Sequence, residues 1–203
     1  MTILLITKPT DKLMKKLLGI LVLGLFLITP SQADDIRDFQ IEGMSIGDSL
    51  LDYLSEKEIL KALEETKDQY SWTDKKFGDV YIYKETENYE YASVSVKRKD
   101  KKYIIYSIRG LIDYEDNNEC LKKQKQIIDE LTSSLNYNEK FEDIFKHPGD
   151  TSGKSTVYGI YLIFDYGNEV EVTCYDFSQK MQYSSGLDVA VNSKEYTDWL
   201  SSW

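Results

Sequence analysis

A run of twelve apolar or glycine residues, Leu17–Ile28, constrains this chain more than any other feature of its sequence. Two lysines precede the run, and the segment that follows it contains small residues and ends at Ala33. A positive start, an apolar run too short to span a bilayer and a small-residue exit are typical of a secretory signal peptide. We therefore expect residues 1–33 to be removed by cleavage after Ala33, so that residues 34–203 build the fold.

The alternative for this segment is an uncut anchor, which needs about twenty apolar residues. No cysteine follows the run at the cleavage site, which argues against a lipid anchor there. The thirteen residues before Met14 are unusual for a signal peptide, and Met14 is an alternative start, so translation of residues 1–13 stays open. We expect a periplasmic or secreted protein with no stable membrane anchor after cleavage.

The expected mature chain is strongly acidic. The whole sequence has a net charge of −10, and residues 1–33 hold four lysines and one aspartate, which leaves −13 on residues 34–203. Such a charge repels nucleic acid and anionic lipid surfaces. The basic residues between Lys97 and Lys102 flank Asp100 in a predicted turn, where we expect solvated side chains. We expect no nucleic-acid partner.

Hydrophobic periodicity predicts helices followed by strands in the first part of this segment. Helical spacing covers Ile46–Leu54 and then Ser55–Leu63, where Ser55 begins a capping-box pattern. From Asp79 the period changes to two, and a further strand is expected over Lys102–Leu111. The connections are too short for parallel crossovers, so these strands form an antiparallel meander.

The second part repeats this order. A helix is expected from residues 116–118 to Leu135, and a polar connection over residues 136–156 follows it. Strands are then predicted over Val157–Tyr166, Glu169–Phe177 and Leu187–Val191, and a short helix from Ser193 ends the chain.

These elements predict an α+β fold. We expect an antiparallel sheet of about six strands, arranged as two three-stranded meanders, with helices packed on one face. The element order is compatible with a tandem of two similar halves, residues 42–111 and 116–203. The alternative is one continuous six-stranded sheet in a single domain over residues 34–203.

The two cysteines, Cys120 and Cys174, both lie in the expected mature chain. An even number of cysteines in an exported chain favours a disulfide, because the compartment is oxidising. Cys120 falls on the apolar face of a predicted helix, and Cys174 shares a strand face with two apolar valines. We expect these two residues to pair.

Local motifs do not define a cofactor or a metal site. Gly149–Ser155 resembles a phosphate-binding loop, but its glycine spacing is one residue short and it leads into a strand instead of a helix. His147 is the only histidine and has no partner for a transition-metal site. We expect no cofactor and assign no catalytic residue.

Oxygen ligands of the kind that calcium prefers are concentrated before the third predicted helix. Their spacing is not that of an EF-hand, so we favour a capped helix start with acids at its positive end over a calcium site. The residues concerned are Asp113, Glu115, Asn117 and Glu119.

Tyrosine is the most frequent aromatic residue, with sixteen copies. Five tyrosines are predicted on strands, several of them opposite an aliphatic face, and could present their rings to a partner. The alternative is that tyrosine occupies strand positions that it favours and covers the sheet edges. The candidate binding face consists of Tyr81, Tyr83, Tyr91, Tyr161 and Tyr175.

Three segments of the sequence carry a resemblance: Ile41–Tyr53 (IEGMSIGDSLLDY), which contains the motif Ile41–Asp48, then Cys174–Asp176, and Tyr196–Leu200. They resemble a family of small uncharacterised exported proteins of marine alphaproteobacteria. This resemblance implies an envelope location and supports the disulfide, but it carries no assigned activity. More distantly, Gly43–Ser45 before two helices and a meander is similar to outer-membrane assembly lipoproteins and β-lactamase inhibitor proteins, although the lipid-bearing cysteine of the former is missing here.

Two functional hypotheses follow. The first is a non-enzymatic binding protein that contacts an envelope protein or another envelope component through its sheet face. The second is a periplasmic hydrolase or small-ligand enzyme whose acidic residues converge only in three dimensions. The absence of a local nucleophile, base or metal motif favours the first. The identity of the partner and the oligomeric state stay open.

Overall fold

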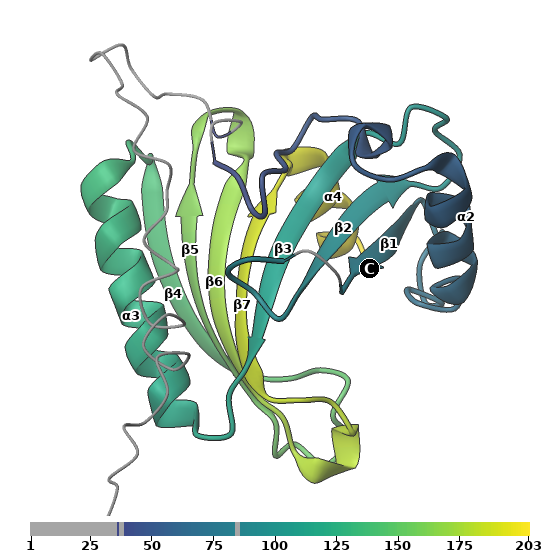
Figure 1. Cartoon of the computed structure of the whole chain (residues 1–203). Coiled ribbons are helices and arrows are strands. Elements are labelled where there is room, and N and C mark those ends of the chain that lie inside the picture. The colour runs from purple at the N-terminus through teal and green to yellow at the C-terminus, as the bar shows by residue number, and fades with distance from the viewer. Residues whose placement is uncertain (1–35, 37–38, 84–85) are drawn as a thin grey trace, which may run out of the picture. The chain divides into compact units, whose positions relative to one another are not determined.

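The computed structural model describes residues 36, 39–83 and 86–203, and the predicted signal peptide with its cleavage site at Ala33 lies outside these residues. The described chain is an α+β fold with three α-helices and one seven-stranded antiparallel sheet (Figure 1). The helical elements are η3 (Leu50–Asp52), α2 (Glu56–Glu65), α3 (Asn117–Ser134), η4 (Asp165–Gly167), η5 (Gln179–Met181) and α4 (Lys194–Ser201). The strands are β1 (Phe77–Ile82), β2 (Tyr91–Lys97), β3 (Ile105–Asp113), β4 (Glu139–Lys146), β5 (Thr156–Ile163), β6 (Glu169–Asp176) and β7 (Gly186–Asn192).

The helix starts follow the predicted capping residues. The Ser55 side chain accepts a hydrogen bond from the Glu58 amide, and the Glu58 carboxylate accepts one from the Ser55 amide at 2.9 Å, which completes the predicted capping box of α2. Asp116 caps α3 by accepting from the Asn118 amide at 2.9 Å. The segment predicted as a first helix, Ile46–Leu54, forms only the short 3-10 helix η3, because its polar turn residues hold most of it in other conformations.

The strand order is β1-β2-β3-β7-β6-β5-β4. The last strand, β7, therefore lies between β3 and β6 and joins the meander β1–β3 to the strands that follow α3 (Figure 1). One continuous sheet results, and the prediction of an antiparallel sheet is confirmed at this level.

The prediction of about six strands misses β4. This strand occupies part of the connection predicted over residues 136–156, and all eight of its residues are exposed. It is the last strand of the sheet and pairs only with β5. An edge strand without a buried side needs no apolar alternation, and the charged side chains of β4 are typical of a protected edge. The sequence of β4 therefore shows no alternation of apolar and polar residues that would predict a strand.

The two faces of the sheet differ in chemistry. Directly paired residues of antiparallel strands place their side chains on the same face. One row across six strands is entirely aliphatic, and we call this side the apolar face. It contains Val80, Val94, Ile108, Val191, Val170 and Leu162.

The opposite side, which we call the polar face, carries neighbouring rows of hydrophilic side chains. One row contains Asp79, Ser95, Ser107, Asn192 and Glu169. The next contains Tyr81, Ser93, Arg109, Ala190, Glu171, Tyr161 and Phe141.

The helices pack on both faces, which corrects the expectation that they share one. Helices α2 and α3 bury their apolar side chains in the core of the apolar face. Helix α4 lies behind β2 and β3 in Figure 1, and its Tyr196 and Trp199 pack against Phe77, whose strand partner is Lys97. The apolar spacing of α4 predicts a buried side but does not indicate which face of the sheet it covers.

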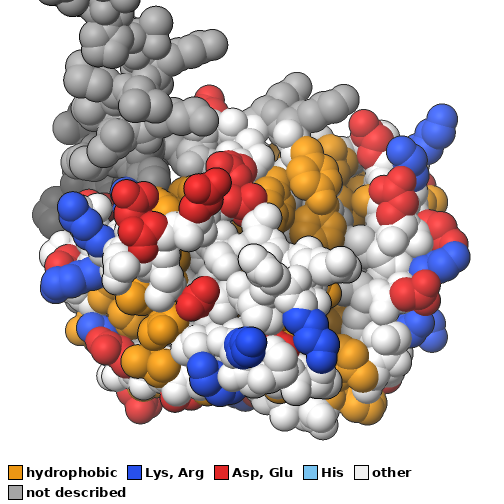
Figure 2. All heavy atoms as spheres, turned by 90° about the horizontal axis from the view of Figure 1, so that it is seen from below, with side chains coloured by type: hydrophobic (Ala, Val, Ile, Leu, Met, Phe, Trp, Pro, Cys, Tyr) orange, Lys and Arg blue, Asp and Glu red, His pale blue; other side chains and the backbone are white. Residues whose placement is uncertain are grey.

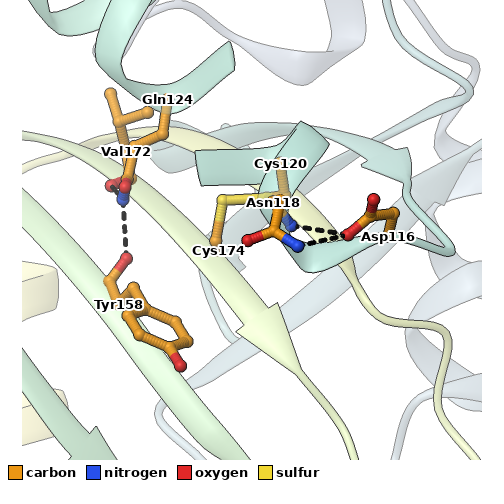
Figure 3. The surroundings of a disulfide bond; sticks show 7 residues. All are labelled: Asp116, Asn118, Cys120, Gln124, Tyr158, Val172 and Cys174. Carbon is orange, nitrogen blue, oxygen red and sulfur yellow. Dashed lines mark hydrogen bonds between the residues drawn. A yellow bond between two sulfur atoms is a disulfide. The ribbon is translucent and has the colours of Figure 1, made fainter. Parts of the chain in front are cut away.

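A disulfide joins α3 to the apolar face (Figure 3). Cys120 and Cys174 are both buried, their Cα atoms are 6.0 Å apart, and they are 54 residues apart in sequence. One turn further along α3, the buried Gln124 side chain donates to the backbone carbonyls of Tyr158 at 2.6 Å and Val172 at 2.8 Å. The helix is thus attached to β5 and β6 by polar contacts as well as by sulfur.

We predict that breaking this disulfide lowers the free energy of unfolding by about 4 kcal/mol, because the cross-link restricts the unfolded chain. Urea denaturation with and without reductant measures the difference. The Cys120→Ala/Cys174→Ala variant is the matched control and should not respond to reductant. Two free thiols in the mass of the unreduced protein, or equal stability with and without reductant, would contradict the disulfide.

Candidate functional site

The structure places four of the five predicted tyrosines on strands of the polar face, and the fifth, Tyr83, follows β1 directly and packs beside Tyr81 and Tyr91. Tyr81 and Tyr161 lie in the same cross-strand row, Tyr81 at one end of it and Tyr161 next to Phe141 at the other. Three rings gather at β1 and β2, where the centroids of Tyr81, Tyr83 and Tyr91 are 5.6–6.3 Å apart. Tyr161 and Tyr175 lie on β5 and β6, so the tyrosines enclose the centre of this face from two sides.

The two predicted tyrosines on β5 and β6 are each part of an aromatic stack. The Tyr161 ring stacks on Phe141 with a centroid distance of 4.5 Å, and Tyr175 stacks on Phe177 at 5.3 Å. Gly159 allows the Tyr161 ring to lie across β5, because a Cβ atom at this glycine would overlap the tyrosine hydroxyl.

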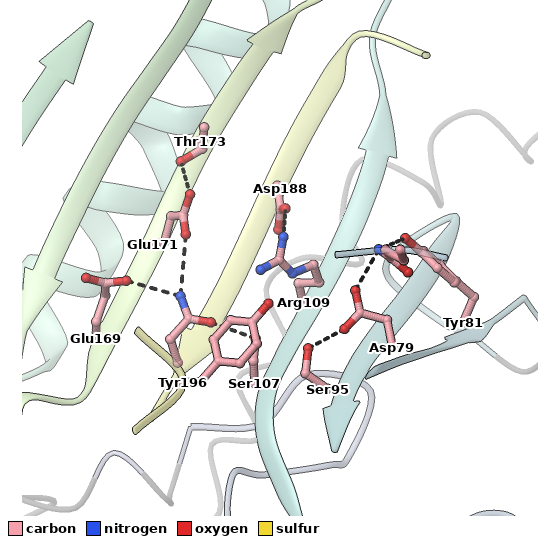
Figure 4. A network of polar contacts seen from close by, with 12 residues as sticks. Asp79, Tyr81, Ser95, Ser107, Arg109, Glu169, Glu171, Thr173, Asp188 and Tyr196 are labelled. Carbon is pink, nitrogen blue, oxygen red and sulfur yellow. Dashed lines mark hydrogen bonds and ion pairs between the residues drawn. The ribbon is translucent and has the colours of Figure 1, made fainter. Parts of the chain in front are cut away.

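Charged side chains occupy the centre of the polar face (Figure 4). The Arg109 Nη1 atom donates to Asp188 Oδ2 at 3.1 Å. The Asp188 side chain is 3% exposed and the Arg109 side chain is 20% exposed. A buried ion pair has a large desolvation cost and contributes little net stability. Its position is therefore not explained by stability alone.

Two further carboxylates lie beside this pair on β6. Asn192 Nδ2 donates to Glu169 at 3.1 Å and to Glu171 at 3.4 Å, so one amide lies between the two acids. Thr173 Oγ1 donates to the other oxygen of Glu171 at 2.8 Å. These contacts hold both carboxylates toward the centre of the face.

A second polar cluster links this centre to α4. Asp79 accepts hydrogen bonds from Ser95 at 2.6 Å, Tyr70 at 2.9 Å and Gln69 at 2.9 Å. The Tyr70 hydroxyl is 2.9 Å from the Tyr196 hydroxyl of α4. Asp79 is therefore fully engaged in structure, and α4 covers this end of the polar face.

Burial and neighbouring charges shift the titration of the central groups. Burial raises the pKa of Asp188 to about 7; Arg109 acts against this shift, whereas Glu171 adds to it. Burial and the Glu171 charge also raise the pKa of Glu169. Burial lowers and the Asp188 charge raises the pKa of Arg109, which ends well above its usual value, so the guanidinium stays charged. Shifted carboxylates gathered in one place are typical of functional sites.

The tyrosine hydroxyls of this face stay protonated. Burial raises the pKa of Tyr91 to about 12, and it also raises the pKa values of Tyr81, Tyr161 and Tyr175. Each hydroxyl can therefore donate as well as accept a hydrogen bond at neutral pH.

Two buried oxygen atoms of the polar face have no hydrogen-bond partner among the described residues. They are Ser93 Oγ and Asp188 Oδ1. Ser93 pairs directly with Arg109 across β2 and β3, so the serine hydroxyl lies next to the ion pair. Buried polar atoms normally have partners, and an unpaired one needs an explanation.

The side of the polar face over β5 and β6 differs from the side under α4. Within the described chain, α4 makes its main contacts with β3, and α3 meets β6 on the apolar face. Tyr161, Tyr175 and Glu171 are partly exposed there, and Phe141 is 42% exposed.

At the end of the molecule seen in Figure 2, hydrophobic side chains form separate groups between acidic and basic ones.

The predicted acidic segment before α3 is used as a helix start. Asp116 caps α3, Asp113 ends β3, and Asp113, Glu115 and Glu119 are exposed. Within the described residues, no group of three or more His, Cys, Asp and Glu side chains has a geometry that would hold a metal ion. The three acids are thus solvated charges, and Asn117 is the partly buried first residue of α3.

The loop that resembles a phosphate-binding motif is held by its own aspartate. The buried Asp150 accepts hydrogen bonds from the amides and hydroxyls of Ser152 and Ser155. These bonds hold the pKa of Asp150 far below its usual value. The loop leads into β5, as the sequence predicts, and its serines are occupied with the aspartate.

A cavity of about 350 Å³ lies away from the polar face and is lined mainly by apolar residues, including Ile46, Tyr106 and Phe164. Its polar groups already have partners: Asp165 accepts from Asn138 at 2.9 Å, and Asn168 accepts from the Lys194 amide at 3.1 Å. Ligand sites usually combine apolar walls with convergent free polar groups. The polar face has convergent polar groups that are free to bind a ligand, and this cavity does not.

The sequence did not single out the central charged residues as a site. Glu169 and Glu171 alternate with Val170 and Val172, which does indicate one apolar and one polar side of β6. Arg109 and Asp188 are 79 residues apart, and only the pairing of β3 with β7 brings them together. That pairing is not encoded in any local motif.

None of the described helices is long and apolar enough to cross a membrane.

We predict that Asp188 makes the folded protein less stable as the pH rises from about 5 to about 7.5. Because the pKa of Asp188 is about 7 in the folded state, Asp188 binds more proton in this window than it does in the unfolded chain, so the free energy of unfolding falls by up to about 1.4 kcal/mol per pH unit. Glu169 acts in the same direction.

Urea denaturation of the native protein and of Asp188→Asn over this window measures the effect, because Glu169 is common to both. The native protein should lose more stability than the variant. Parallel pH dependences would show that Asp188 titrates normally.

No protein-family model matches this chain, and no curated protein and no solved structure is significantly similar to it. The resemblance to exported alphaproteobacterial proteins and the distant fold likeness therefore stay predictions.

Proposed function

We propose that this chain is an exported, non-enzymatic binding protein whose polar face docks an envelope protein or another envelope component. The single observation that supports this most is the joint position of the tyrosines and the Arg109–Asp188 ion pair, whose aspartate is buried, on one face of the sheet. Tyrosine rings offer a large contact area at a small entropic cost, and aromatic and arginine side chains dominate many interfaces.

An envelope location agrees with the predicted signal peptide and with the disulfide, because disulfides persist in oxidising compartments. We propose the periplasm as the place of action.

The enzyme hypothesis has one observation in its favour: the convergence of Asp188, Glu169 and Glu171, with raised pKa values for the first two. A general acid must come within hydrogen-bond reach of its substrate. Asp188 is only 2% exposed and its accessible partner is Arg109, so it does not present a proton to a bound molecule. Because Asp188, the acid whose pKa is raised to about 7, is buried, the site favours binding over hydrolysis.

A photo-crosslinking amino acid, p-benzoylphenylalanine, placed at position 161 in cells that export the protein tests the proposal. We expect a defined adduct from Tyr161, because its ring lies on the open part of the polar face. Tyr166 is the matched control: it lies in the turn between β5 and β6 and is 91% exposed. If contact were non-specific, the control position would react at least as well.

Equal adducts from both positions, or no adduct from position 161, would contradict docking on the polar face. The same probe at Gln126, which is exposed on α3, would detect docking on the helical side instead.

A further inference from the structure

The polar face presents unused hydrogen-bond donors at its centre. A guanidinium has five N–H donors. Arg109 donates one hydrogen bond among the described residues, to Asp188, and its side chain is 20% exposed. Because part of this side chain is exposed, solvent, and therefore a ligand, can reach it.

Hydrogen-bond acceptors lie on β6, and only β7 separates them from Arg109 on β3. Arg109 and Glu171 both pair with Ala190, so they face each other across β7. Glu169 has one oxygen without a hydrogen bond among the described residues, and its neighbour Glu171 is partly exposed. Donors and acceptors therefore alternate over the short distance that separates three adjacent strands, roughly 10 Å.

Buried oxygen atoms without a hydrogen-bond partner also lie next to this centre. Ser93 is 2% exposed, its Oγ atom has no partner among the described residues, and its side chain neighbours Arg109 on the polar face. A hydroxyl that is buried without a hydrogen-bond partner destabilises the folded state. Both this atom and Asp188 Oδ1 are too buried for a ligand to touch, so a water molecule held beneath a bound ligand would satisfy them.

Aromatic groups surround the polar centre. Tyr91 lies on the β2 side, and the Tyr161 and Tyr175 stacks lie on the β5 and β6 side. The hydroxyls of Tyr91 and Tyr175 form no hydrogen bond with the described residues. These side chains combine a flat apolar surface with a polar end.

The charges restrict the chemistry of the ligand. An anion would meet Asp188, Glu169 and Glu171 beside a single guanidinium, in a protein with an expected mature charge of −13. A cation would lie against the charged Arg109. A purely apolar ligand would leave these buried polar groups without partners.

We propose that the polar face binds a neutral oligosaccharide. Each sugar hydroxyl both donates and accepts, so adjacent hydroxyls match the alternation of Arg109 donors with Glu171 and Glu169 acceptors. The C–H faces of a sugar ring are apolar and pack on the flat Tyr161 and Tyr175 rings. This inference rests on the proposed function and specifies the chemistry of the envelope component.

An array of neutral oligosaccharides, including the β-1,4-linked tetramer of N-acetylglucosamine, is screened with the purified mature protein. Isothermal titration calorimetry then measures the dissociation constant of the best array member. We expect Tyr161→Ala and Glu171→Gln each to weaken this binding about tenfold or more, which corresponds to about 1.4 kcal/mol. Tyr166→Ala is the matched tyrosine control and should bind as the native protein does.

Circular dichroism of each variant shows whether it is folded, and Tyr175→Ala replaces Tyr161→Ala if the latter is not. Spermidine and a lysine decamer are titrated in parallel as cationic probes. Binding of these cations without any oligosaccharide, no oligosaccharide bound below millimolar concentration, or glycan binding that all polar-face variants retain would overturn the proposal.

The two levels of the proposal fail separately. A protein adduct at position 161 together with an empty glycan array would reject the oligosaccharide and leave docking on the polar face intact. Absence of both signals would reject the proposed function as well.

Discussion

The pairing of β7 with both β3 and β6 is the interaction on which the rest of this structure depends. It inserts the last strand into the middle of the sheet and thereby joins two segments that are distant in sequence. Asp188 and Asn192 reach the polar face only through this strand, where they meet Arg109 from β3 and the glutamates of β6. The polar network is thus a consequence of topology.

The sheet separates stability from the candidate function. On the apolar face, aliphatic rows pack under α2 and α3, and the Cys120–Cys174 disulfide fixes α3 to the strands. On the polar face, the chain buries charges that an aliphatic replacement could have avoided. Proteins depart from consistent local chemistry mainly at functional or strained sites. The Arg109–Asp188 pair and the unpartnered Ser93 oxygen are such departures, and they lie beside the tyrosines.

The sequence predicts the elements whose signals are local. The capping box at Ser55, the helix that starts at Asp116 and the alternation in β1, β2 and β6 all appear in the structure. Glu42, inside the motif Ile41–Asp48, accepts hydrogen bonds from three successive amides at residues 87–89, so part of this motif is structural. Arg98, expected in a solvated turn, instead donates to carbonyls at the end of α2.

The features that the sequence could not predict depend on long-range placement. Strand β4 has no buried side and therefore no periodic signal. The side of the sheet that α4 covers is set by contacts of Phe77 with Tyr196 and Trp199, over more than a hundred residues of chain. Alternation predicts which tyrosines share a strand face, but the charged groups between them need the complete strand order.

The central claim is that the polar face is a docking surface. Hydroxyl-radical footprinting read by mass spectrometry tests it directly, because it reports the accessibility of each tyrosine with and without a periplasmic and envelope fraction. The account predicts that Tyr91, Tyr161 and Tyr175 become protected while Tyr166 does not. Protection confined to α3 and its neighbours, or no change at these three tyrosines, would contradict it.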